Sequence, residues 1–257
     1  MPKGDLPSLW SEAIMQASTV RRYCHWVLAL AWLCLPGVGR TDYPTAIAPF
    51  EASYKVYLAG IAVGQAEIQL EYQGDSHYRM RSSLHPVGVA GLLATEGMDE
   101  EVEGEFVGGT PRPLAYRAQR TGSKARTVSL NFDWDRGEVT TVVSGKLGRL
   151  ALGPRMVDPL TLYLLTMLDL RSEALADEYG VIDRDRLKTY RTQMQEEAMT
   201  ATPIGELATL AISRQRPDSS KAVKFWHAPT LGFLPVQVSK TKDGAETSRL
   251  SIQRLTR

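Results

Sequence analysis

FEASYKVYL, residues 50–58, alternates apolar with polar side chains. Every second residue is apolar, and several are aromatic or β-branched, which is the pattern of a half-buried β-strand. Turn residues such as Gly, Pro and Asp separate further segments with the same alternation: 66–72, 77–84, 100–106, 114–120, 127–134, 138–143, 206–214, 221–227, 234–240 and 246–255. This series of about ten or eleven short strands predicts a mainly β protein with an antiparallel sheet.

We expect this sheet to curl into an open or closed barrel, of the half-barrel or lipocalin-like kind. One main helix is predicted at about residues 158–171, where Asp158 can cap the N-terminus and Pro159 suits the first helical position. An apolar stripe follows at helical spacing: Leu160, Tyr163, Leu164, Met167 and Leu168. The stripe predicts that one face of the helix packs on the sheet.

Residues 184–199 fit two structures. Their many Glu, Gln, Arg and Met residues favour a helix, whereas Tyr190, Thr192 and Met194 alternate as in a strand. Because strand pairing overrides weak propensities, we favour the strand, with a turn at 202–205 leading into the next one.

Residues 1–39 differ from the rest of the chain. Arg21-Arg22 precedes an apolar run at 23–35, and the small residues of Gly37-Val38-Gly39 follow. This order is typical of a secretory signal peptide. The alternative is a membrane anchor, but the run is shorter than the ~20 residues that a spanning helix needs.

We therefore expect 1–39 to be an N-terminal extension plus signal peptide, cut near Gly39–Arg40. Residues 40–257 would then form a single β-rich domain in the periplasm, without a transmembrane span. Met15 is an alternative start to Met1. Cleavage removes both cysteines and takes the formal net charge from +1 to zero. A thiol-free chain suits an oxidising compartment, and a charge-balanced one argues against nucleic-acid binding.

The residues that could carry catalysis or bind a metal form no recognisable motif. The scattered histidines lack the spacing of metal ligands. Ser82-Ser83, His85 and Asp99 are the residue types of a catalytic triad, but no G-x-S-x-G sequence accompanies them. We expect no cofactor, no metal and no catalytic residue, and we leave the enzyme question open while leaning against activity.

One predicted strand is strongly acidic on one face. Asp99, Glu101, Glu103 and Glu105 share one face of segment 99–106. Such carboxylates could bind Ca²⁺ or act as acid and base. Because like charges repel least in water, we favour a solvated face, answered by Arg112, Arg117 or Arg120 of the neighbouring strand.

The segment Pro86–Ala94 carries no charge and follows neither strand nor helix periodicity. It is either a buried strand or an apolar flap at the mouth of a barrel, loosened by its glycines. Trp134 and Trp226 suit core packing, with ligand stacking as the alternative. If the sheet encloses a ligand, the candidate binding residues are Tyr54, Val56, Ile68, Leu70, Val87, Val89, Leu92, Leu93 and Trp226.

Landmarks along residues 49–255 follow a recognisable order. They are Phe50-x₃-Tyr54, Gly60-x₃-Gly64, the apolar segment at 87–93, Gly104, Pro113-x₂-Tyr116, Asp158-Pro159-Leu160-Thr161-Leu162-Tyr163, Thr202-Pro203-x-Gly205, Phe225-Trp226-x-Ala228 and Leu234-Pro235-Val236. Their order resembles the bacterial family known as domain of unknown function 3108. The resemblance implies an exported, β-rich protein with no established activity. Members of that family look distantly like envelope half-barrels that carry lipids or lipoproteins, which is an analogy of fold.

These observations lead to a periplasmic, non-catalytic protein that binds an apolar or amphipathic, lipid-like envelope ligand. An adaptor or assembly factor for an envelope protein or polysaccharide complex is the alternative. A hydrolase with no recognisable motif is a second alternative. The sequence leaves the ligand, the protein partner and the oligomeric state open.

Overall fold

The computed structural model describes residues 47–87, 97–217 and 219–257. Within them the chain forms fourteen β-strands, one α-helix and one short 3₁₀ helix. In chain order these are β1 (Phe50–Leu58), β2 (Ile61–Gln73), β3 (His77–Pro86), β4 (Met98–Val107), β5 (Thr110–Arg120), β6 (Arg126–Asp133), β7 (Glu138–Val143), β8 (Lys146–Ala151), α2 (Pro159–Arg171), β9 (Glu178–Asp183), β10 (Arg186–Thr202), β11 (Gly205–Gln215), β12 (Lys221–Ala228), η1 (Pro229–Leu231), β13 (Leu234–Lys242) and β14 (Ala245–Thr256). The predicted mainly β architecture is confirmed.

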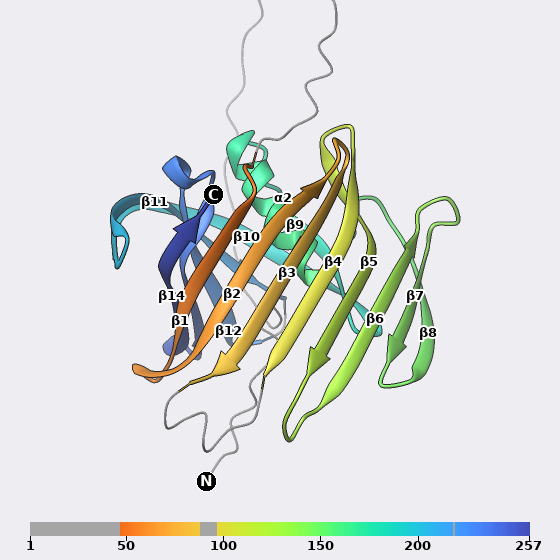
Figure 1. Ribbon diagram of the computed structural model, residues 1–257, viewed down its shortest axis with the longest axis horizontal. Helices are drawn as coiled ribbons and strands as arrows, with labels where there is room; N and C mark the ends of the chain where they lie inside the picture. Colours follow the sequence, from red (N-terminus) through yellow and green to blue (C-terminus); the bar gives the residue numbers. More distant parts are fainter. Residues whose placement is uncertain (1–46, 88–96, 218) are drawn as a thin grey trace, which may run out of the picture.

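All fourteen strands belong to one antiparallel sheet, in the order β8-β7-β6-β5-β4-β3-β2-β1-β14-β13-β12-β11-β10-β9 (Figure 1). The sheet consists of two meanders, β1–β8 and β9–β14, which meet where β1 pairs with β14. It is not closed, because β8 and β9 remain at opposite ends of the order. Of the two predicted forms, the open one is therefore present, and the closed barrel is wrong.

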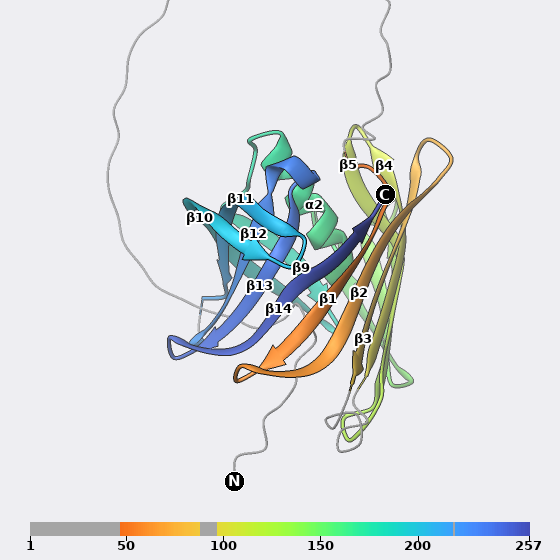
Figure 2. The ribbon, with the colours of Figure 1, turned by 60° about the vertical axis from the view of Figure 1, so that its left-hand side comes forward.

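The two meanders face each other as walls, and α2 lies between them (Figure 2). We call the sheet surface toward α2 the inner face and the opposite surface the outer face. On β1 the side chains of Phe50, Ala52, Tyr54 and Val56 are buried, while Leu58 at the strand end is exposed. Their neighbours across β2, including Leu70 and Ile68, are buried as well and belong to the same alternating, inward-facing set.

Helix α2 begins where the sequence indicated. Asp158 caps it, with Oδ1 accepting hydrogen bonds from the backbone N–H groups of Leu160 (2.8 Å) and Thr161 (3.0 Å). Leu160, Tyr163, Leu164 and Met167 of the predicted apolar stripe belong to the main core cluster, so that face of the helix packs on the sheet as expected. However, eleven of the thirteen residues are buried, so the opposite side of the helix is covered as well, which the stripe did not predict. A helix that lies between two walls buries nearly its whole circumference, and only a helix apolar on all sides suits that position.

Polar contacts fix α2 to both walls. On one wall, Tyr163 Oη lies 3.2 Å from Tyr54 Oη, and Thr161 Oγ1 lies 2.8 Å from Tyr78 Oη. On the other wall, Arg214 Nη2 donates to Thr166 Oγ1 at 2.7 Å, and Tyr179 Oη donates to Asp169 Oδ2 at 2.6 Å. Buried hydrogen bonds of this kind stabilise a folded chain by about 1 kcal/mol each, so the helix is a built-in part of the core.

Of the two structures considered for residues 184–199, the predicted strand is confirmed. Most of it lies in β10, which pairs with β9 through residues 186–191 and with β11 through residues 191–202. The strand expected at 206–214 corresponds to β11. No described helix is long and apolar enough to pass through a membrane.

Candidate functional site

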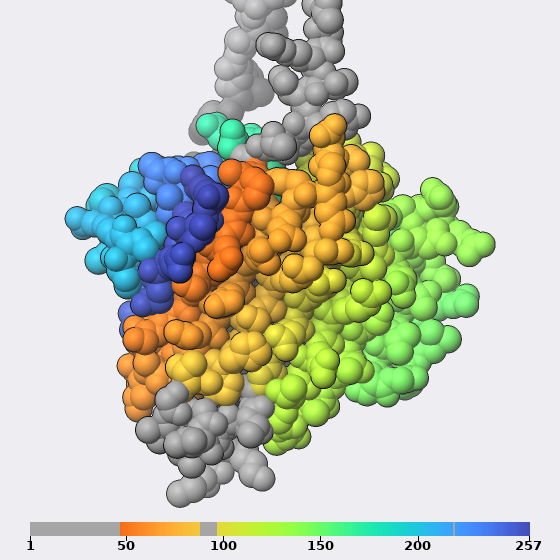
Figure 3. All heavy atoms as spheres, in the orientation of Figure 1, coloured from red at the N-terminus to blue at the C-terminus, as the bar shows by residue number. Residues whose placement is uncertain are grey.

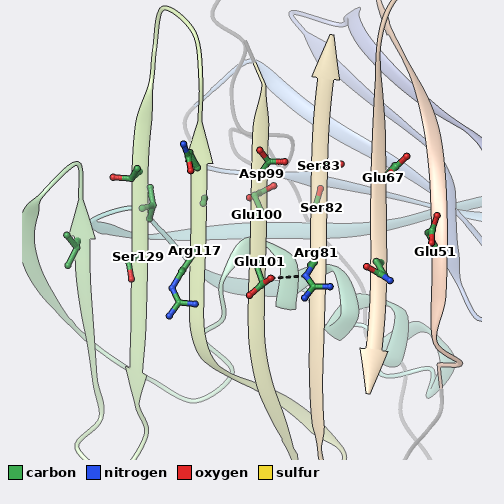
Figure 4. A pocket seen from close by; sticks show the side chains of 16 residues that line it. Glu51, Glu67, Arg81, Ser82, Ser83, Asp99, Glu100, Glu101, Arg117 and Ser129 are labelled. Carbon is green, nitrogen blue, oxygen red and sulfur yellow. Dashed lines mark hydrogen bonds and ion pairs between the residues drawn. The ribbon is translucent and has the colours of Figure 1, made fainter. Parts of the chain in front are cut away.

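An open hollow of about 690 Å³ lies on the sheet across β1–β7, among strands seen from outside in Figure 3 and close up in Figure 4. Most of the residues that line it occupy the outward positions of their strands. The lining consists of Glu51, Glu67, Gln69, Arg81, Ser82, Ser83, Asp99, Glu100, Glu101, Arg117, Ala118, Gln119, Thr127, Val128, Ser129 and Val142. Most lining side chains end in a carboxylate, guanidinium, amide or hydroxyl group, while carbon atoms supply most of the exposed surface, so the hollow suits a ligand with both polar groups and apolar surface.

Strand register arranges the outward side chains in two rows. One row runs Glu67, Ser83, Asp99, Gln119 and Thr127 across β2 to β6. Adjacent members are about 5 Å apart, the spacing of paired strands. This row contains two carboxylates and no cation.

The second row runs Glu51, Gln69, Arg81, Glu101, Arg117 and Ser129 across β1 to β6. Arg81 Nε donates to Glu101 Oε2 at 2.8 Å, which neutralises that pair (Figure 4). Glu51 and Glu67 make no ion pair or side-chain hydrogen bond with any described residue. The hollow therefore offers unpartnered carboxylates to a ligand.

The acidic residues of β4 lie on the outer face, as expected, but their arginine partners come from β3. Arg79 pairs with Glu103, and Arg81 pairs with Glu101. The hydrogen bond from Arg79 lowers the pKa of Glu103. Strand β4 pairs with both β3 and β5, so arginines of either strand could contact its carboxylates. The sequence alone does not show which of the two strands supplies them, and the arginines of β5 were predicted.

The residue types of the triad do not assemble into one. His85 Nε2 lies 3.4 Å from Asp99 Oδ1, and both side chains are 58% exposed. No hydrogen bond joins Ser83 to His85 in the described part of the chain, and Ser82 is buried on the other face. Without a hydroxyl held against the imidazole, nucleophilic catalysis has no starting geometry here.

Four of the predicted ligand-binding residues, Tyr54, Val56, Ile68 and Leu70, come together on the inner face, all 7% exposed or less. They belong to one core cluster with the α2 side chains, which include Tyr163. The structure therefore places a helix where the sequence suggested space for a ligand. Whether these residues bind a ligand stays a prediction.

The other predicted binding residues do not join them. Val87 follows β3, and its N–H donates to Val63 O at 3.0 Å. Val89, Leu92 and Leu93 lie outside the described residues.

Trp226 was expected beside the inward residues, and that expectation is wrong. It alternates with the buried Phe225 along β12, so it lies on the outer face. Its half-buried ring packs at the margin of the core, with Lys224 Nζ 4.9 Å from the ring centroid. The error arose because the sequence alone did not show which of the alternating positions in this strand point to the inner face.

Sequence reasoning missed one buried carboxyl group. Glu100 lies on the inner face of β4, is only 3% exposed, and accepts a hydrogen bond from Tyr116 Oη at 2.5 Å. Its Oε2 has no hydrogen-bond partner in the described part of the structure. Burial raises the pKa of Glu100 to about 7, and the nearby charges of Asp158 and Asp183 act in the same direction. The sequence did contain a signal for this position. Glu100 directly precedes Glu101, so if Glu101 points outward, the side chain of Glu100 must point to the inner face.

Two other ionisable groups have a shifted pKa, the half-buried Lys240 and the buried His227. Burial lowers the pKa of Lys240 to about 8, while Glu100 opposes that change. Burial also lowers the pKa of His227 to about 3, so this imidazole is neutral at pH 7. The described residues contain no group of three or more His, Cys, Asp or Glu side chains that could hold a metal ion.

Solved structures give matches at the level of the fold. The chain is similar to the beta-barrel-like protein of domain of unknown function DUF1849 from Brucella abortus, with a TM-score of 0.55, 9% identity, and 80% of this chain and 96% of that chain covered. Also matched are a protein named as a lipoprotein from Parabacteroides distasonis (TM-score 0.36, 10% identity, 81% and 95% covered) and one named as an exported protein from Bacteroides fragilis (TM-score 0.34, 11% identity, 81% and 95% covered). The first likeness is consistent with a barrel-like fold, while the open ends of this sheet follow from its own strand order.

Sequence comparison is more specific. No curated protein matches this chain. A family model, Protein of unknown function (DUF3108), matches residues 53–251. That range includes most of the sequence landmarks and nearly the whole sheet. The chain therefore belongs to the DUF3108 family of proteins of unknown function.

Proposed function

We propose that this protein is an exported, non-catalytic binding protein that holds a polar ligand in its outer hollow and serves the assembly of an envelope polysaccharide. The hollow itself is the observation that supports the proposal, because it is open and lined mostly by side chains with polar groups, whereas the inner face is packed. Export to the periplasm rests on the signal-like pattern of residues 1–39.

The chemistry of the lining favours a ligand rich in hydroxyl and amino groups. The carboxylates of Glu51 and Glu67 can accept hydrogen bonds, and Gln69 and Gln119 can both donate and accept. Carboxylates outnumber arginines in the hollow, so a cationic or neutral ligand is favoured over an anionic one. A volume of about 690 Å³ is within the usual range for small-ligand sites, and an amino-sugar oligosaccharide has this chemistry.

A lipid-like ligand on the inner face is the weaker candidate. It would contact Tyr54, Val56, Ile68 and Leu70 only if α2 moved away, since these residues share one core cluster with the helix. That movement would break the contacts from Tyr163 to Tyr54 and from Thr166 to Arg214. The burial of the helix on all sides therefore opposes this alternative.

Calorimetric titration separates the two candidates. The ligands are a glucosamine trisaccharide, which is cationic, maltotriose, which is neutral, and a galacturonic acid trisaccharide, which is anionic. We expect the glucosamine trisaccharide to bind most tightly. Glu51→Gln and Glu67→Gln should each weaken it roughly tenfold, the effect of losing one charged hydrogen bond.

Glu173→Gln is the matched control, because Glu173 is exposed and lies outside the lining. Equal affinities in wild type and both hollow variants would refute the proposal. Native mass spectrometry with dodecanoate tests the other candidate. A stoichiometric fatty-acid complex, together with no saccharide binding, would move the function to the inner face.

A further inference from the structure

The β10–β11 hairpin extends beyond its neighbours as a two-stranded arm. Strand β10 pairs with β9 only through residues 186–191, and β12 pairs with β11 only through residues 210–215. Residues 193–209, which we call the arm, are therefore supported mainly by each other. Figures 1 and 2 show this hairpin leaving the body of the sheet.

The arm is ordered by contacts of its own. Thr200 Oγ1 lies 2.8 Å from Thr209 Oγ1, and Thr209 Oγ1 donates to Ala198 O at 2.9 Å. Both threonines are buried. A partner that binds the arm would meet a preformed strand pair, so binding would cost little conformational entropy.

One face of the arm continues the inner face of the sheet, and its methionine side chains are exposed in the described part of the structure. Met194 pairs with the buried Ile212, Glu197 pairs with Leu210, and Met199 pairs with Ala208, so these residues share a face. Met194 is 57% exposed and Met199 is 60% exposed. Two large apolar side chains this exposed on one face offer a partner an apolar contact, and methionine adapts to varied partners.

The same arm carries only negative charges. No Lys or Arg occurs from Thr192 to Ser213, whereas Glu196, Glu197 and Glu206 lie within this range and are exposed. None of the three carboxylates forms an ion pair with a described residue. Uncompensated charge beside exposed methionine favours a partner that combines positive charge with apolar side chains.

We propose that the arm is the docking surface for a cationic, amphipathic segment of another polypeptide. The methionines pack against the apolar residues of the segment, and the glutamates attract its Lys or Arg residues. An anionic membrane surface is disfavoured, because it would repel the same glutamates. The proposal stands apart from the outer hollow and does not depend on what the hollow binds.

A labelled eight-residue peptide of alternating Lys and Leu is the probe, and fluorescence anisotropy at low and high salt is the measurement. We expect the wild type to bind this peptide, and to bind it more weakly at high salt. It should not bind a peptide of alternating Glu and Leu. The double variants Met194→Gln with Met199→Gln, and Glu197→Gln with Glu206→Gln, should each lower the affinity roughly tenfold.

Controls come from the rest of the surface. Leu147 is 62% exposed on β8, and Glu173 is exposed after α2. Leu147→Gln with Glu173→Gln should bind the peptide like wild type, and thermal unfolding should confirm that every variant folds. Arm variants that bind like wild type would overturn the proposal. Binding to phosphatidylglycerol vesicles that depends on the two methionines would overturn the assignment to a polypeptide.

Discussion

Replacing Glu100 with glutamine tests the most unusual electrostatic feature of the core. Glu100 is buried, its Oε2 has no partner among the described residues, and burial raises its pKa to about 7. Glutamine keeps the shape and an oxygen that can accept from Tyr116 Oη, but it cannot ionise. Glu100→Gln therefore isolates the effect of the buried charge.

The sign and size follow from the two pKa values. The pKa is about 7 in the folded chain and about 4.5 in the unfolded chain, so the folded state binds the proton more tightly. The wild type therefore loses stability as pH rises from about 4.5 to about 7, by about 3 kcal/mol in total. Asp158, whose pKa is raised to about 6 by burial, acts in the same direction. Glu100→Gln should remove the contribution of Glu100.

Urea unfolding at pH 5 and pH 8 measures this effect. We expect Glu100→Gln to be more stable than wild type by up to about 3 kcal/mol at pH 8, and by about 1 kcal/mol or less at pH 5. Glu101→Gln, on the exposed face of the same strand, should change stability by less than about 1 kcal/mol at both pH values. If Glu100→Gln were no more stable than wild type at pH 8, the assignment of a buried, strained carboxylate would be wrong.

Four further outcomes are expected. Asp158→Ala should destabilise the protein by about 1–2 kcal/mol, while Asp158→Asn keeps the helix cap and should not, as urea unfolding at pH 8 can check. Gly104→Ala should cost about 3 kcal/mol or more, because its Cβ would lie 2.4 Å from Tyr78 Cζ; normal expression and an unchanged melting temperature would contradict this. Tyr54→Phe should cost about 1–2 kcal/mol through the lost bond to Pro235 O, measurable in the same urea experiment. EDTA and reductant should leave the melting temperature of residues 40–257 unchanged, because both cysteines precede residue 40 and no metal cluster occurs in the described residues; a fall of several degrees with EDTA would show a metal site.

Local patterns predicted much of the sheet and the start of the helix. Alternation identified β1 because one of its faces is buried, and the Asp158-Pro159 pair identified the N-terminus of α2. Strands β8 and β9 were not predicted. Each has only six residues and contains a glycine, and each lies at an end of the sheet. A strand with one paired edge needs less regular alternation, so its sequence carries a weaker signal.

The candidate site was harder to predict, because it depends on register. Glu67, Ser83 and Asp99 become neighbours only through the pairing of β2, β3 and β4. The sequence contains the residue types but not their alignment across strands. The burial of α2 between the two walls was also not predicted. The near absence of charge in its sequence indicated burial on all sides, whereas the apolar stripe by itself predicted burial of only one face.

The pairing of β1 with β14 has a consequence for how the chain folds. Every other strand pair in the sheet joins neighbours in sequence, so each meander can form from local contacts. The seam between them joins residues about 200 positions apart, and closing a loop of that length costs about 5 kcal/mol in chain entropy. The final strand must therefore be available before the two walls can unite around α2. During synthesis, the apolar inner face of the first meander stays partly uncovered until β14 has been made. We therefore expect the risk of aggregation to be greatest in that interval.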